Sequence, residues 1–361
     1  MVNKKSLFER ISNSALFIFI IILFFSKLLI YILIKNDYLS IELGGGSDAV
    51  YYDAYAEGYI DIAVNIWPVL LRYLNDFNLY SREFISYIYL FLNLFIIPFI
   101  VAKLSQIKLR ENQKYYFYIL LICLIYPTLY FFTFDIYRDV FMVIIFLLGC
   151  LTVKKALDTY NILIMIVVLS FCTAIGIFLF ALRPYLGAAF LGSLLLFNIK
   201  FTKMRIILLG FIYLIGLWLA NYVGVFDSIT EYRSGFDELE AGSNLGLDFS
   251  NPAMFIPNFI LSFLGQILGL YITNPLAIIL LLVETVPFLF MLIYVIKNIK
   301  WADKFVRFLI VFFVLYGSIW LIGNDNLGTA VRLRLYNYFA IYISFFYILN
   351  LKEQALKNYI R

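Results

Sequence analysis

Long apolar stretches dominate this sequence, and they constrain its fold more than any other feature. A helix that crosses a bilayer needs roughly 20 mostly apolar residues, because its backbone polar groups must be satisfied within the segment. With 64% hydrophobic and 14% charged residues among 361, the chain is predicted to be an all-α, polytopic helical membrane protein with about ten spans. We expect one integral membrane domain, 1–361, with spans at about 15–34, 84–102, 115–133, 139–153, 161–180, 185–199, 205–222, 276–296, 305–323 and 335–350.

The basic residues are sorted by type across this predicted membrane. With both termini inside, the inner loops carry fourteen lysines and five arginines, as the positive-inside rule requires. The outer side then keeps Lys35 and seven arginines: Arg72, Arg82, Arg138, Arg183, Arg233, Arg332 and Arg334. Topology is indifferent to the kind of basic residue, whereas the planar guanidinium grips phosphate or carboxylate at two points. The sorting therefore predicts an anionic substrate at the outer face.

Two outer loops, 35–83 and 223–275, are long enough to hold interfacial or re-entrant helices. The segment 254–272 is apolar enough to cross the membrane. A full span here would reverse the next helix and place Lys297, Lys300 and Lys304 outside. We therefore expect a re-entrant or interfacial segment, broken at Pro257. The expected spans at 139–153, 185–199 and 335–350 are short, which suggests that they begin or end inside the protein.

The first outer loop holds the densest chemistry. Ser47 or Asp48 is placed to cap a short helix that runs to about Gly58. Asp53 and Glu57 lie four residues apart and so share a helical face. Tyrosine rings offer apolar plates for sugars whose hydroxyls the carboxylates would accept, and these tyrosines are Tyr51, Tyr52 and Tyr55. The alternative is a capped interfacial helix with its tyrosines in the aromatic belt.

Three later outer corners present arginine where two spans meet. Their residues are Asp135, Arg138 and Asp139 at the first, Arg183, Pro184 and Tyr185 at the second, and Asp325, Arg332 and Arg334 at the third. The first corner also fits a helix cap with a local ion pair. Arg183 has almost no loop around it, which favours a protein cavity over the lipid surface. Arg332 and Arg334 point different ways on a helix, so we expect one to bind ligand and the other to pack.

Other residues limit the chemistry. Glu284 lies deep within a span, three residues before Pro287, and either serves function or caps carbonyls that the proline frees. The chain has no histidine, which removes the usual neutral-pH base and the commonest transition-metal ligand. No cofactor or metal site is expected, although a divalent ion at Asp48 and Asp53 is not excluded. The net charge of +5 reflects lysines near anionic lipid, and no nucleic-acid partner is expected.

The tyrosine-rich acidic loop, the Tyr137-Arg138-Asp139 and Arg183-Pro184-Tyr185 corners and the late arginine pair together resemble the Wzy-type polymerases of O-antigen and capsule repeat units. The resemblance implies glycosyl transfer between undecaprenyl-pyrophosphate-linked glycans, donor and acceptor, at the periplasmic or exterior face of the bacterial plasma membrane. It also implies a possible chain-length regulator as partner, and contacts from Arg138, Arg183, Arg332 and Arg334 to pyrophosphate or glycan. The related O-antigen ligases rely on an outer histidine, which this chain lacks. An arginine followed by ten residues and glycine, found in some of these polymerases, is absent at Arg183 and Arg233.

The sequence thus predicts catalytic roles for Asp48, Asp53, Arg138, Asp139 and Arg183. Substrate binding is predicted for Tyr51, Tyr52, Tyr55, Glu57, Tyr185, Asp325, Arg332 and Arg334. Two alternatives remain open at this point. One is a glycosyltransferase of the class that uses polyprenyl-phosphate sugars to modify a glycan or lipid, in which the acids of the first outer loop are central. The other is a flippase or transporter of lipid-linked glycans.

Overall fold

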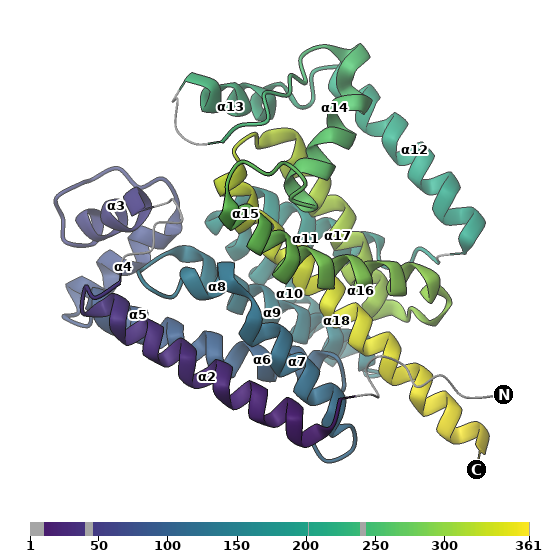
Figure 1. Ribbon diagram of the computed structural model, residues 1–361. Helices are drawn as coiled ribbons and strands as arrows, with labels where there is room; N and C mark the ends of the chain where they lie inside the picture. The colour runs from purple at the N-terminus through teal and green to yellow at the C-terminus, as the bar shows by residue number, and fades with distance from the viewer. Residues whose placement is uncertain (1–10, 40–45, 201, 239–242, 361) are drawn as a thin grey trace. The chain divides into compact units, whose positions relative to one another are not determined.

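The computed structural model describes residues 11–39, 46–200, 202–238 and 243–360, and the regular secondary structure in these ranges is helical. One isolated bridge joins Asn244 to Asn326. The chain divides into two compact units, Met1–Leu147 and Leu148–Arg361, which we describe separately; their helices are drawn in Figure 1. The single membrane domain expected from the sequence stays a prediction.

The first unit combines long apolar helices with short amphipathic ones. α2 and α6 both pack against α7, and α3 packs against α4. Serine and asparagine side chains begin several of these helices: Ser81 accepts from the Phe84 amide, and Asn65 accepts from the Trp67 amide, as N-caps do. The helical segments are α2 Asn13–Lys35, α3 Gly46–Ala56, α4 Ile66–Asp76, α5 Arg82–Phe91, η1 Leu92–Ile96, α6 Ile97–Leu104, α7 Gln113–Ile125, α8 Pro127–Phe131 and the first half of α9 Arg138–Asp158.

The second unit is centred on α17 and α18. α17 packs against both α11 and α18, and α16 packs against α18. Most residues of α18 from Leu333 to Ile348 are buried. After the end of α9, the helical segments are α10 Ile162–Leu182, α11 Pro184–Leu196, α12 Lys203–Tyr222, α13 Asp227–Glu238, η2 Pro252–Met254, α14 Phe255–Ser262, η3 Phe263–Ile267, α15 Pro275–Leu280, η4 Leu281–Thr285, α16 Val286–Lys297, η5 Ile299–Trp301, α17 Lys304–Gly323 and α18 Leu327–Ile360.

Prolines explain two π turns in the described helices. η1 ends two residues before Pro98, and η4 ends two residues before Pro287. Proline has no N–H to bond to the carbonyl four residues earlier, and a π turn lets the helix continue around that lost bond. Glu284 lies within η4 and is fully buried. The proline therefore shapes the turn that carries this acid.

A close helical hairpin sets the position of Arg183. α10 ends at Leu182, Arg183 is extended, and α11 begins at Pro184, so the two helices are joined by one residue, as the sequence predicts. The return is tight enough that a Cβ added to Gly187 would lie 2.2 Å from the backbone nitrogen of Phe180. Only glycine allows this approach of two backbones.

Gly187→Ala is therefore expected to destabilise the protein by about 1–3 kcal/mol, because backbone cannot yield as a flexible side chain can. Thermal unfolding of the purified protein in detergent would measure this loss. Gly210→Ala is the matched control, since Gly210 is also helical but has open space where its Cβ would go. The control is expected to unfold at the parent temperature or slightly above it. Equal melting temperatures for the two variants would contradict the proposed close approach.

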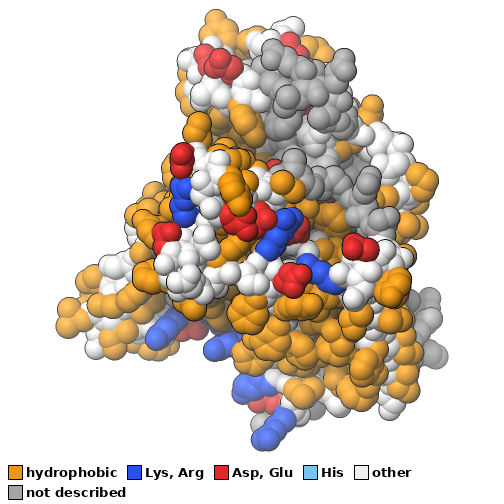
Figure 2. Space-filling view, turned by 90° about the vertical axis from the view of Figure 1, so that its left-hand side faces the viewer, with side chains coloured by type: hydrophobic (Ala, Val, Ile, Leu, Met, Phe, Trp, Pro, Cys, Tyr) orange, Lys and Arg blue, Asp and Glu red, His pale blue; other side chains and the backbone are white. Residues whose placement is uncertain are grey.

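Seven helices in the described part of the chain are long and apolar enough to cross a membrane. The all-helical architecture is confirmed, and these helices fit a multi-pass membrane protein. On the face shown in Figure 2, hydrophobic side chains form broad exposed areas, which suits contact with lipid. The number of spans, the N-in/C-in orientation and the interfacial placement of α3, α4 and α13 stay predictions.

Two of the three expected short spans are wrong. The stretch 139–153 lies in a helix of 21 residues, and 335–350 lies in α18, which has 34. Both helices continue through polar residues that hydropathy excludes, such as Lys154 and Lys352. The stretch 185–199 is indeed short, at 13 helical residues in α11.

The segment 252–274 enters and leaves the second unit at the same end. Near its start, the Phe249 carbonyl accepts from Asn221 at the end of α12. Near its finish, Thr273 bonds to Ser243, whose carbonyl accepts from Leu327 at the start of α18. Between these points, the Ile267 carbonyl accepts from Tyr338, about 16 Å along α18 from Leu327. The segment therefore packs along α18 and turns back within the second unit. Its re-entrant or interfacial placement in a membrane stays a prediction.

The predicted break of this segment at Pro257 is wrong. Pro257 does not break the segment, because helix runs through it from Pro252 to Ile267. Pro257 lies in the first turn of α14, where a missing N–H costs nothing, since the first four amides of a helix have no partner within it.

Candidate functional site

Arginine side chains gather at one end of the second unit, which we call the arginine end. The helix junctions there are in contact: a Cβ added to Gly323 would lie 2.5 Å from the Ile229 side chain and 2.9 Å from the Tyr185 hydroxyl. Four arginines lie here, and each is at most 9% exposed. They are Arg183, Arg233, Arg332 and Arg334.

The opposite end of the same unit, the lysine end, carries a different set of cations. Arg307 donates to the Asn198 carbonyl over 3.3 Å, and Lys352 donates to Asn298 over 2.9 Å, which brings the ends of α11, α16 and α18 together. Its basic residues include Lys200, Arg205, Lys297, Lys300, Lys304, Arg307 and Lys352. The structure thus separates two groups of basic residues at opposite ends of one unit.

Arg233 holds the arginine end together. Its guanidinium donates to the carbonyls of Leu321 (3.0 Å), Ile322 (3.2 Å), Asn324 (2.6 Å) and Leu247 (2.9 Å), and it is ion-paired with Asp325. Three of these carbonyls belong to the last turn and C-cap of α17, where the partial negative charge of the helix is concentrated. Arg233 thus ties α13 to the end of α17.

Asp325 is consequently engaged on both oxygens. One accepts from Arg233 and the other from the Gly246 amide over 2.8 Å. Gln266 of η3 also belongs to this buried network, because it donates to the Asn324 carbonyl over 2.8 Å. The predicted substrate contact of Asp325 stays a prediction, and the structure gives its side chain a positioning role.

A second buried ion pair lies two turns into α18. Arg334 donates to Glu284 over 2.9 Å, and both side chains are almost fully buried. η3 and η4 frame this pair. η4 supplies Glu284 and also Thr285, which is 2.9 Å from the Tyr338 hydroxyl, and η3 supplies the Ile267 carbonyl to which Tyr338 donates. Glu284 therefore does more than cap carbonyls freed by Pro287: it compensates a guanidinium.

A cavity of about 540 Å³ opens beside Arg233. Its lining combines acids, hydroxyls, an amide and one aromatic ring: Asn221, Asp227, Thr230, Glu231, Arg233, Gly246, Leu247, Asp248, Phe249 and Ser250. Hydrogen bonds from the Ser250 hydroxyl and amide lower the pKa of Asp248, so its carboxylate is charged at neutral pH. None of these lining residues is among the site residues predicted from the sequence.

In the first unit, Arg82 joins two acids from different elements. It binds Asp135 at two points, 2.7 and 2.6 Å, and Asp53 of α3 at 3.0 Å. Tyr80 also donates to Asp53; its burial and this bond raise the pKa of the Tyr80 phenol well above its usual value. Asp135 is thus linked to an arginine 53 residues earlier in the chain as well as to the Ile136 amide.

The remaining first-unit candidates lie around this link. α3 is confirmed as a helix with Asp48 in its first turn. Tyr51 donates to the Ile62 carbonyl, Tyr52 is buried, and the Tyr55 ring lies 4.6 Å from the Arg72 guanidinium carbon. Glu57 follows the end of α3 and is exposed. The roles predicted for Glu57 and the three tyrosines, and the alternative of an interfacial helix, stay predictions.

Arg138 and Asp139 begin α9. Arg138 is half-buried and Asp139 is fully buried in the first turn, where a carboxylate is favoured by the positive end of the helix. Arg82, Arg233 and Gln266 were not among the predicted site residues. Only the sorting of arginine to one side drew attention to the first two, and no pattern in the sequence marks Gln266.

No protein-family model matches the chain, and neither a curated protein nor a solved structure is similar to it. Among the described residues, no group of three or more acids or cysteines is placed to hold a metal ion. The functional proposal therefore rests on the geometry within each unit and on the resemblance described from the sequence.

Proposed function

We propose that the protein is a membrane glycosyltransferase that joins oligosaccharide repeat units carried on undecaprenyl pyrophosphate. The observation that carries the proposal is the arginine end, where four arginines with at most 9% exposure lie at one end of a helical unit. Buried guanidinium groups require anions, and a lipid pyrophosphate is an anion that reaches such a site from the bilayer. We assign the pyrophosphate to Arg183, at the one-residue junction of α10 and α11, and to Arg332, near the start of α18.

In the proposed reaction, an acceptor hydroxyl oxygen attacks the anomeric carbon of the donor glycan. The bond from that carbon to the pyrophosphate oxygen breaks, and its electron pair leaves with undecaprenyl pyrophosphate. Preorganised cations such as Arg183 stabilise this growing charge. The hydroxyl proton passes to a carboxylate. Within the second unit the candidates are Asp227, Glu231 and Asp248, which line the cavity beside Arg233. The catalytic roles predicted for Asp48, Asp53 and Asp139 of the first unit stay predictions.

The cavity beside Arg233 supports a glycan substrate. Sugar hydroxyls can donate hydrogen bonds to the carboxylates of Asp227, Glu231 and Asp248. The Phe249 ring offers an apolar surface for the faces of the sugar rings. Its volume of about 540 Å³ is within the range of pockets that hold molecules of a few rings. We assign it to the acceptor glycan, at the outer face of a bacterial plasma membrane. This orientation follows from the lysine end facing the cytoplasm.

One observation favours a second candidate. Asp53, Arg82 and Asp135 form a compact acid–arginine cluster in the first unit, and the first outer loop is the place where transferases that use polyprenyl-phosphate sugars concentrate their acids. Asp48→Asn and Asp53→Asn separate the two functions. They are expected to impair a polymerase driven by arginine and to abolish the activity of the second candidate.

Arg183→Lys is expected to lower the amount of polymer by about a hundredfold, because lysine keeps the charge but loses the two-point grip on phosphate. The test is complementation of a deletion strain, with lipid-linked glycans separated on a gel. The deletion and Arg183→Lys strains should accumulate single repeat units. Arg110→Lys, an exposed arginine in the α6–α7 loop, should restore full-length polymer.

Other gel patterns would contradict the proposal. Full-length but altered polymer in the deletion strain would favour the modifying transferase. Complete absence of outward-facing glycan would favour a flippase. Variant protein must be present at the parent level on an immunoblot, so that loss of polymer reports on activity.

A further inference from the structure

The first half of α12 presents a wide apolar face that the described protein does not cover. Only 6% of this helix's most apolar window is buried inside the protein, against 67% for α17. Met204, Ile207, Leu208, Phe211 and Ile212 are all largely exposed, and at 100° per residue they share one face about 140° wide. Gly210, beside this face, has nothing within 4 Å of its Cβ position. An apolar face of this width has to be covered by lipid or by protein.

α12 is fastened to the unit only through its second half. Trp218 donates to the Pro252 carbonyl over 2.9 Å, Asn221 donates to the Phe249 carbonyl over 3.0 Å, and Leu217 is buried in a cluster with Phe255. Toward its first residue, the helix leans away from the other helices of the unit (Figure 1). The helix is therefore anchored at the arginine end and open at the lysine end.

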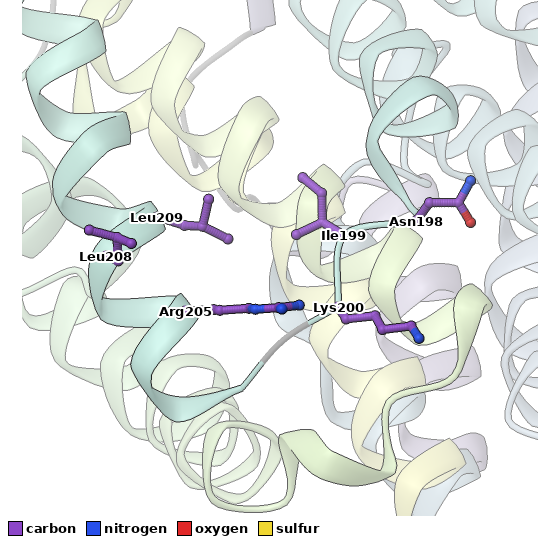
Figure 3. Close-up of a pocket in the computed structure, with 6 residues that line it drawn as sticks. All are labelled: Asn198, Ile199, Lys200, Arg205, Leu208 and Leu209. Atoms are coloured by element: carbon purple, nitrogen blue, oxygen red, sulfur yellow. The ribbon is translucent and has the colours of Figure 1, made fainter.

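A cavity of about 500 Å³ lies where α12 begins. It is lined by Asn198, Ile199, Lys200, Arg205, Leu208 and Leu209, and Figure 3 shows Arg205 extending from the helix toward the loop that carries Lys200, with Leu209 facing Ile199. Two cations thus stand at one side of a mostly apolar hollow whose lining contains no acid. Arg307 binds the Asn198 carbonyl from α17 and so braces the loop that forms one wall.

We propose that this cavity binds one anionic phospholipid of the surrounding membrane. The headgroup phosphate lies between Lys200 and Arg205, where the guanidinium can bind two phosphate oxygens. An acyl chain continues past Ile199, Leu208 and Leu209 along the bare face of α12. Charge complementarity selects an anionic lipid, and the apolar lining selects a lipid over a soluble phosphate. The inference is independent of the proposed glycosyl transfer.

The test is native mass spectrometry of the full-length protein in detergent, titrated with phosphatidylglycerol. The parent is expected to retain one tightly bound phosphatidylglycerol. K200Q/R205Q is expected to bind it about thirtyfold more weakly, as the loss of two basic groups near an anionic headgroup predicts. Both side chains are exposed, so the variant should keep the parent melting temperature. The matched control is K297Q/K300Q, which removes two exposed lysines at the same end and should leave the affinity unchanged.

Three results would overturn the proposal. Binding of phosphatidylcholine as tight as that of phosphatidylglycerol would remove the role of charge. Displacement of the lipid by glycerol 3-phosphate at millimolar concentration would identify a soluble-anion site. A dimer that binds no lipid would show that a second copy of the chain covers α12.

Discussion

Asp325→Ala is expected to lower the free energy of unfolding by about 3–5 kcal/mol, because it removes the carboxylate that is ion-paired with the buried Arg233 guanidinium. Arg233 is 4% exposed and would keep its carbonyl partners while losing the carboxylate with which it is ion-paired. The Gly246 and Leu247 amides would lose their acceptor as well. The attachment of α13 and of residues 246–247 to the end of α17 would therefore weaken together. The measurement is the melting temperature and the folded fraction after gel filtration in detergent.

The contrast with an exposed pair makes this prediction specific. Asp61 is also ion-paired to an arginine, Arg72, at 3.1 Å, but its side chain is 91% exposed. Asp61→Ala should leave the melting temperature unchanged, since water replaces the lost partner. Asp325→Asn should fall between, because an amide oxygen can still accept from Gly246. Equal effects of Asp325→Ala and Asp61→Ala would show that the Arg233 network is not needed for folding.

The sequence predicts the helical class well because span length and apolar composition are local properties. It also predicts the one-residue junction at Arg183, since Arg183-Pro184 separates two apolar runs. The return of the 252–274 segment follows from charge bias in the next loop. Hydropathy fails where polar residues extend a helix, as in α18, and at Pro257, whose effect depends on its position in the first turn.

The sequence alone does not reveal which charged side chains form ion pairs. Asp53 and Arg82 are 29 residues apart, Arg233 and Asp325 are 92 apart, and Glu284 and Arg334 are 50 apart. No spacing rule connects such residues, because each pair is created by how helices pack. A charge in an apolar stretch indicates that a partner exists, but only the fold identifies it. The sequence therefore shows where the charged side chains lie along the chain, but it does not predict which of them form ion pairs with one another.

The Glu284–Arg334 pair separates a structural role from a catalytic one. Glu284→Leu is expected to destabilise the protein by about 3–5 kcal/mol. The Arg334 guanidinium stays charged at all ordinary pH values, and its burial keeps it from being solvated once the carboxylate is removed. Arg334→Met should cost less, since an unpaired glutamic acid side chain can take up a proton and become neutral. The double variant Glu284→Leu/Arg334→Met removes both charges and fills the space with apolar atoms, so it should recover most of the stability lost in Glu284→Leu.

Polymer formation by this double variant then decides what Arg334 does. Since Arg334 is ion-paired with Glu284 and 2% exposed, we expect the double variant to make full-length polymer while Arg332→Ala makes only single repeat units. That outcome would assign the two arginines of α18 to packing and to substrate, respectively, as their opposite directions on the helix suggest. A stable double variant that makes no polymer would instead place Arg334 at the substrate and make Glu284 its positioning residue.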